Sequence, residues 1–201
     1  MTVIEKLQKH DSVHTVEDAL ARITYLQPVQ LGLSGSEASQ QVLIETLPSI
    51  LVLHLKRFLY DTATNGINKI SKPIQFAPEL EISHGTIFAS FTPCYPRLRI
   101  YCGLVGPDIM TPVAGKSAEP VHYKLYGVLY HHGKSAGSGH YTVDVLHPNG
   151  GSGNGEAWLH IDDEDVSAVW SEDVFGRGNN ERGDERCAYM LFYYRTAPTQ
   201  T

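Results

Sequence analysis

The sequence predicts an α+β fold that is mainly antiparallel β-sheet with few helices. One amphipathic helical pattern lies near the start, and strand-like alternation recurs at least six times after residue 28. Turn-forming glycine, proline and asparagine residues separate these runs, which favours antiparallel neighbours. The 201 residues, of which 42% are hydrophobic, suffice to bury a core.

The helix is predicted at residues 16–23. Thr15 and Asp18 have the spacing of a capping box, in which each side chain bonds the backbone of the other residue. From Val16 onward, apolar residues follow at i+3, i+4 and i+7, which places them on one helical face.

The strands follow in order along the rest of the chain. Residues 41–46 alternate, and the apolar run 49–55 is typical of a strand buried on both faces. Residues 74–82 alternate across Pro78, which favours an edge strand. Four later runs also read as strands: 123–130, 140–145, 158–161 and 187–194.

Residues 84–120 are the least regular part of the chain. They hold five prolines, and residues 98–104 alternate enough to allow a short strand. We predict an irregular surface insertion in one domain that spans residues 1–201.

Composition excludes several classes of protein. Sixteen basic against 22 acidic residues give a net charge of −6 without a block of one sign, which argues against a nucleic-acid partner. No apolar run approaches the ~20 residues of a membrane span, and the charged start differs from a signal peptide, so no membrane partner is expected. Three cysteines without framework spacing predict a reducing compartment, the cytoplasm or also the nucleus.

The hairpin at residues 139–163 brings a histidine to an aspartate. If its Gly/Asn/Pro loop spans residues 148–155, the pairing places His140 beside Asp162, where opposed Cβ atoms are roughly 5 Å apart. Alternation continued to the strand end would point Asp163 to the opposite face. A carboxylate on one imidazole nitrogen orients the ring and leaves the other nitrogen to take a proton. From the residues alone, a structural pair is the commoner interpretation and catalysis stays open.

A nucleophile for such a base is missing. Cys187 and Cys102 have the contexts of core residues, and no helix start or basic partner accompanies Cys94. Residues 133–137 fit G-x-S-x-G, but no helix follows them, as that motif requires.

Metal and cofactor motifs are also missing from the sequence. It has no C-x-x-C pair, and the adjacent His131 and His132 cannot both point into one site from a strand. Val128 stands where a phosphate-binding loop needs glycine. We predict no metal and no cofactor.

Four motifs carry a resemblance to a known family. They read LPSILVLHLKRF at 47–58, YKLYGVLYHHG with GHYT at 123–142, WLHIDD at 158–163 and AYMLFYYR at 188–195. In this order and spacing they resemble the C-terminal half of the catalytic domain of ubiquitin-specific proteases, which are papain-like cysteine deubiquitinases. The doubled histidine is most like the ubiquitin-specific protease ten subgroup and its fungal relatives.

The resemblance implies the palm-like half of a papain-like fold, and an enzyme that hydrolyses (iso)peptide bonds at the C-terminal glycine of ubiquitin. It implies His140 as general base, Asp162 as its orienting acid and Asp163 as a residue near the oxyanion. Gly139 and Tyr141 would line the cleft for the ubiquitin tail. The implied partners are ubiquitin and ubiquitinated proteins.

The sequence also departs from the family. The cysteine box GNTCxxN and the zinc-binding C-x-x-C pairs of its N-terminal half do not occur. We therefore expect a fragment of an active hydrolase that is inactive without the missing N-terminal half and exposes apolar strand surface at Ile50–Leu55. The alternative is a non-catalytic ubiquitin-interacting or scaffold protein.

Overall fold

The computed structural model describes residues 2–4, 12–24, 27–31, 36–44, 47–63, 65–82, 100–105, 120–135, 137–148, 156–176 and 186–197. Its elements in chain order are β1 (Thr2–Ile4), α1 (Val16–Thr24), β2 (Gln27–Leu31), β3 (Ser36–Ile44), β4 (Ile50–Leu55), β5 (Phe58–Asp61), β6 (Gly66–Lys69), β7 (Glu79–Ile82), β8 (Ile100–Val105), β9 (Val121–His132), β10 (His140–His147), β11 (Ala157–Asp162), β12 (Asp165–Val169), α2 (Ser171–Gly176) and β13 (Cys187–Arg195).

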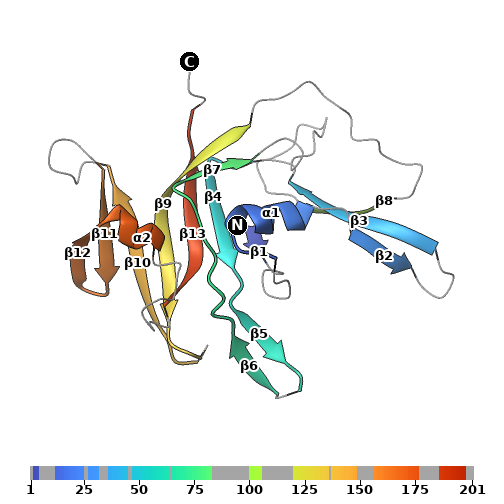
Figure 1. The fold of residues 1–201 in the computed structure, drawn as a ribbon, viewed down its shortest axis with the longest axis horizontal. Coiled ribbons are helices and arrows are strands. Elements are labelled where there is room, and N and C mark those ends of the chain that lie inside the picture. Colours follow the sequence, from blue (N-terminus) through green and yellow to red (C-terminus); the bar gives the residue numbers. More distant parts are fainter. Residues whose placement is uncertain are drawn as a thin grey trace.

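The main sheet has eight strands. Seven lie in the order β1-β4-β13-β9-β10-β11-β12, and β7 pairs with β9 beside this path (Figure 1). Its pairings are antiparallel except that of β1 with β4. A three-stranded sheet β2-β3-β8 and a two-stranded sheet β5-β6 complete the described strands. The predicted α+β, mainly antiparallel fold is confirmed.

Helix α1 begins where its cap predicts. The amide of Asp18 donates to Oγ1 of Thr15 and the amide of Thr15 donates to Oδ2 of Asp18, each at 3.0 Å. This reciprocal bonding satisfies backbone donors that the first helical turn leaves without partners. In the described ranges, no helix is long and apolar enough to cross a membrane.

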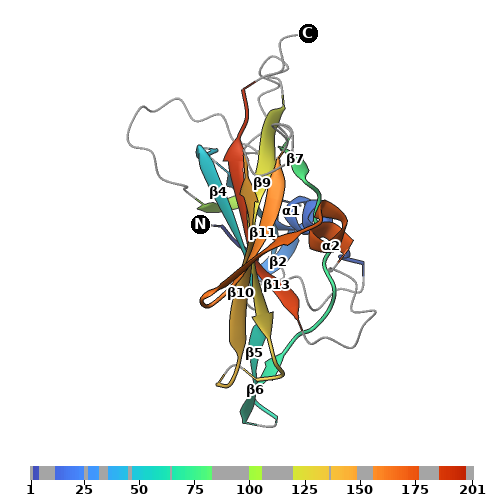
Figure 2. The ribbon, with the colours of Figure 1, turned by 90° about the vertical axis from the view of Figure 1, so that its left-hand side faces the viewer.

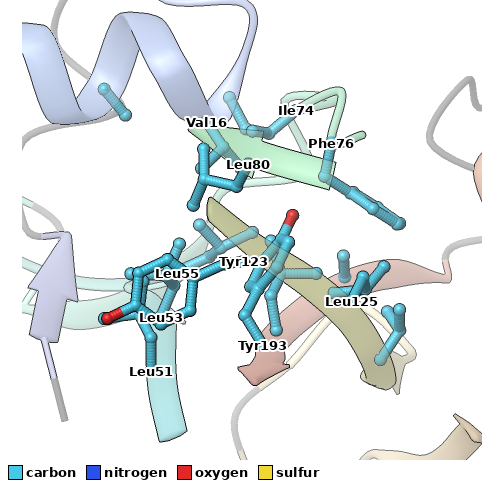
Figure 3. Close-up of a cluster of buried hydrophobic side chains, with 14 of the residues drawn as sticks. Val16, Leu51, Leu53, Leu55, Ile74, Phe76, Leu80, Tyr123, Leu125 and Tyr193 are labelled. Atoms are coloured by element: carbon cyan, nitrogen blue, oxygen red, sulfur yellow. The ribbon is translucent and has the colours of Figure 1, made fainter. Parts of the chain in front are cut away.

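The core lies on one face of the main sheet. Both helices contact this face and lie on the same side of the sheet in Figure 2. Apolar side chains from α1, β4, β7, β9 and β13 and from the extended segment before β7 meet there (Figure 3): Val16, Leu51, Leu53, Leu55, Ile74, Phe76, Leu80, Tyr123, Leu125 and Tyr193. This packing anchors the long strands that carry the candidate site at one end.

Strand β4 corrects one prediction. Leu51, Leu53 and Leu55 are at most 2% exposed, whereas Ile50 is 49% exposed and Val52 is only partly buried. The strand is therefore buried on one face, not on both, because the helices cover only that face. The expected exposure of the whole Ile50–Leu55 surface is wrong for the three leucines.

Several helices and strands of the structure were not predicted from the sequence. No strong periodicity marks the hairpin β5-β6, the edge strand β12 or the six-residue helix α2. Tertiary contacts hold α2 in place: the Tyr130 hydroxyl donates to the Val174 carbonyl at 3.2 Å. The short strand allowed at 98–104 is present as β8, paired with β3. The remainder of the predicted insertion, 84–99 and 106–119, lies outside the described residues.

Candidate active site

Strands β10 and β11 bring His140 and Asp162 together. Nε2 of His140 is hydrogen-bonded to Oδ1 of Asp162. The two side chains are 46% and 43% exposed, at the end of the main sheet away from the hairpin loop. The pair is therefore open to a reacting group.

The register that produces this contact differs from the predicted one. Val143 pairs with Ile161 and Asp144 with His160, and this register, continued one pair beyond the end of the ladder, would bring Asp162 opposite Thr142 and not opposite His140. His140 thus reaches Asp162 along the diagonal, a distance that long side chains can bridge. His140 and Asp162 are in contact as predicted, but the prediction that they lie directly opposite each other on the two strands is wrong.

The two groups shift each other's pKa. The hydrogen bond to Asp162 raises the pKa of His140 above its ordinary value, with a further Coulombic contribution from the same carboxylate. The same bond lowers the pKa of Asp162. Because Asp162 occupies Nε2, Nδ1 is the ring nitrogen left to face a nucleophile, and a raised pKa makes it a stronger base.

Asp163 lies beside the pair. Its φ of 52° ends the extended conformation of β11, so the predicted orientation to the opposite face is wrong. The donor atoms of His140, Asp162 and Asp163 lie within 4.8 Å of one another. These atom types suit a divalent cation, but the hydrogen bond already uses two of the three groups.

Gly139 is packed against a buried histidine. A Cβ at this position would lie 2.1 Å from Nε2 of His131, so a larger residue fits only if the His131 ring or the backbone shifts. His131 is 1% exposed, and its ring contacts those of Phe58 and Tyr141 with centroids 5.1 and 5.0 Å apart. Tyr141 is 46% exposed, and both predicted tail-cleft residues border the aromatic cluster around His131.

The loop between β9 and β10 is held from another part of the chain. Nζ of Lys69, at the end of β6, donates to the carbonyl of Gly133 at 2.5 Å. Gly133 adopts a φ of 94°, which favours glycine. Between the two strands that this loop joins, Nε2 of His132 on β9 is hydrogen-bonded to the hydroxyl of Thr142 on β10 at 2.9 Å.

A comparison with family models gives the family of this chain. The model of the family described as ubiquitin carboxyl-terminal hydrolase matches residues 3–193. This chain belongs to that family, as a C-terminal part of a ubiquitin-specific protease catalytic domain. The resemblance drawn from the four motifs is confirmed.

The curated relatives agree with the motifs. Similar proteins include ubiquitin carboxyl-terminal hydrolase 10 of Rattus norvegicus, 34% identical over 193 residues, and probable ubiquitin carboxyl-terminal hydrolase 3 of Schizosaccharomyces pombe, 34% identical over 201 residues. Both alignments cover 92% of this chain, but only 20% and 32% of those proteins. The chain therefore spans a third or less of these relatives.

Solved structures of ubiquitin-specific protease domains share the fold. The SAGA Ubp8/Sgf11/Sus1/Sgf73 DUB module bound to ubiquitin aldehyde gives a TM-score of 0.62 at 22% identity, covering 94% of this chain and 35% of that chain. The Ubp8-Sgf11-Sgf73-Sus1 SAGA DUB module gives 0.60 at 22% identity, covering 94% and 32%. The fold of the ubiquitin-specific protease chain is thus papain-like, as expected.

The sequence prediction missed a second histidine–aspartate contact in this ubiquitin-specific protease segment. Asp144 accepts from Nδ1 of His160 at 2.5 Å and from Nη2 of Arg186 at 2.9 Å. Period-two alternation along each strand puts His140 and Asp144 on one face of the first strand, and His160 and Asp162 on one face of the second. If the loop had been taken one residue longer, the predicted pairing would have placed Asp144 directly opposite His160.

Proposed function

We propose that this chain is part of a thiol-dependent deubiquitinase that hydrolyses (iso)peptide bonds at the C-terminal glycine of ubiquitin. The observation that carries the proposal is the exposed His140–Asp162 hydrogen bond in a chain of this family. A related fold bound to ubiquitin aldehyde supports ubiquitin as the partner. Gly139 and Tyr141 are assigned to the cleft for the ubiquitin tail.

The proposed chemistry is a proton relay at His140. Asp162 holds the ring through Nε2, and Nδ1 accepts the proton of a cysteine thiol as its sulfur attacks the carbonyl carbon. The imidazolium then returns this proton to the leaving amine, and a thioester remains. Water, deprotonated by the same nitrogen, releases ubiquitin and restores the thiol. Asp163 is assigned a supporting role near the oxyanion.

We propose that the thiol comes from an N-terminal half of the catalytic domain, outside the 201 residues of this chain. Cys187 is 6% exposed, and its sulfur lies 3.7 Å from the carbonyl oxygen of His131, inside the sheet. The side chains of Cys94 and Cys102 lie outside the described residues. A thiol buried inside the sheet is not accessible to a substrate, so we expect this chain alone to be inactive.

The face of the main sheet opposite the core also carries apolar surface, but His140 lies on the core face, because Thr142 and Asp144 of the same strand face pair with the core residues Tyr130 and Val128. The thiol therefore has to approach the pair from the core side. Both described helices pack on the core face. On the opposite face, apolar side chains from five strands are only partly buried or exposed: Ile50, Val52, Leu129, Val143, Val145, Leu159, Ile161 and Phe192. A large apolar surface of this kind favours association with another segment.

The test uses a ubiquitin probe with a C-terminal electrophile. The chain alone should remain unlabelled. A chimera in which this chain replaces the matching segment of the Schizosaccharomyces pombe relative should be labelled and should hydrolyse a ubiquitin C-terminal amide. Labelling of the chain alone at one of its cysteines would overturn the proposal. A folded chimera that binds ubiquitin without hydrolysis would support the scaffold alternative.

A further inference from the structure

A buried charge network lies behind the exposed pair. Asp144 is 0% exposed and is bonded by both His160 and Arg186. The guanidinium carbon of Arg186 lies 3.6 Å from the centroid of the Tyr130 ring. The network therefore joins β9, β10, β11 and the residue before β13.

The backbone ladder between β10 and β11 stops just before the candidate site. It runs from the pair His147–Ala157 to the pair Val143–Ile161. Beyond it, His140 pairs with β9 and Asp162 with β12. The contact of Asp144 with His160 lies one residue pair from that end, on the face that carries the exposed pair.

An exposed ion pair orients itself poorly. Water screens its attraction, and two mobile side chains lose entropy when they are held together. A buried, charge-assisted hydrogen bond is stronger and has defined geometry. The orientation of His140 towards Asp162 therefore needs support from the strands that carry them.

We propose that His160, held by Asp144, which Arg186 also binds, is a positioning residue that fixes β10 against β11 where His140 meets Asp162. The residue acts through Asp162, two positions further along the same strand face, and does not touch the reacting atoms. Its consequence for turnover rests on the proposed deubiquitinase function. Its structural effect can be measured without a substrate.

An electrostatic role and a positioning role of His160 predict opposite changes in the pKa of His140 when His160 is replaced. The groups that face this ring are His132, Asp162 and Asp163. His160 contributes a Coulombic lowering of the pKa of Asp162. Removing the Coulombic influence of His160 would raise the pKa of His140, whereas loss of alignment with Asp162 would lower it. The sign of the change separates the two roles.

The experiment is an NMR titration of His140 in this whole chain with two amide replacements. Asn places its amide where Nδ1 of His160 lies, so H160N should keep the bond to Asp144; Gln places it further out, so H160Q should lose the bond. Because a contacting opposite charge shifts a pKa by about one to three units, and this pair is exposed, H160Q should lower the pKa of His140 by about half a unit. H160N should leave it within about 0.2 unit of the parent.

Controls keep the outcome interpretable. H122Q makes the same change at an exposed position of β9 and should not move the pKa of His140. If H160Q does not fold, H160T, which suits a half-buried strand, should give the same fall. An unchanged or raised pKa in a folded H160Q or H160T overturns the positioning role, and so does an equal fall in H160N. None of these results depends on deubiquitinase activity, so the two proposals fail separately.

Discussion

Two histidine–aspartate pairs lie on the same two strands, and their surroundings differ. The pair His140–Asp162 is nearly half exposed, whereas in the pair His160–Asp144 the carboxylate is fully buried and also bonded by Arg186. Water weakens the first pair but gives a substrate access to it, while burial makes the second costly to break. Location, more than residue type, separates a pair suited to proton transfer from one suited to holding strands.

The largest expected effect comes from breaking the buried pair. R186M leaves Asp144 buried with one partner fewer, so it should lower the free energy of unfolding by about 3–5 kcal/mol. Urea unfolding followed by circular dichroism measures this loss. The matched change R195M, at the exposed end of β13, should cost less than about 0.5 kcal/mol. Equal losses in the two variants would remove the distinction between buried and exposed charges.

The next effect concerns the backbone before His140. G139A places a Cβ 2.1 Å from Nε2 of His131, so the buried His131 ring or the strand must shift, at a cost of about 1–3 kcal/mol. G137A is the control, because its Cβ would meet Oγ of Ser135 at an ordinary 3.8 Å. The free energy of unfolding in urea should fall in G139A, and the NMR chemical shifts of His140 should change. In G137A both should stay near the values of the parent chain. A G139A variant that matches G137A would show that the close contact is easily relieved.

The sequence predicted the exposed pair better than the buried one. Alternation and the loop were enough to bring His140 near Asp162, although β10 ends at His147 and β11 starts at Ala157, which makes the connection one residue longer than assumed. The turn at Asp163 could not be foreseen, because its positive φ has no glycine to signal it. Arg186 reaches Asp144 across 42 positions of sequence, and that contact depends on how the two strands pack, which local patterns do not encode.

The smallest effect is the pH dependence of the exposed pair. The raised pKa of His140 means that its stabilising contribution is complete below the ordinary value of 6.5 and is lost as pH rises through the folded value. The lowered pKa of Asp162 means that its contribution is present above 3.8 and is lost as pH falls through the folded value. The pair is therefore fully formed between about pH 4 and pH 6.5.

An NMR titration tests this window directly. His140 should titrate above 6.5, and D162N should lower its midpoint, while the unfolding midpoint in urea changes little because both side chains are exposed. D165N, a change to an exposed carboxylate on β12, is the control and should leave the midpoint of His140 within about 0.3 unit. A midpoint that does not respond to D162N would mean that the hydrogen bond does not persist in solution.

The most direct test of the proposed function is turnover by the chimera that carries this chain, measured as hydrolysis of a ubiquitin C-terminal amide. H140A should abolish it, and D162A should lower it by on the order of 10²–10⁴, the usual contribution of a positioned acid or base. D163A should lower it clearly less, because its carboxylate lies beside the pair without orienting the ring. Turnover that survives H140A, or a larger loss in D163A than in D162A, would contradict the assignment of His140 and Asp162 as base and orienting acid.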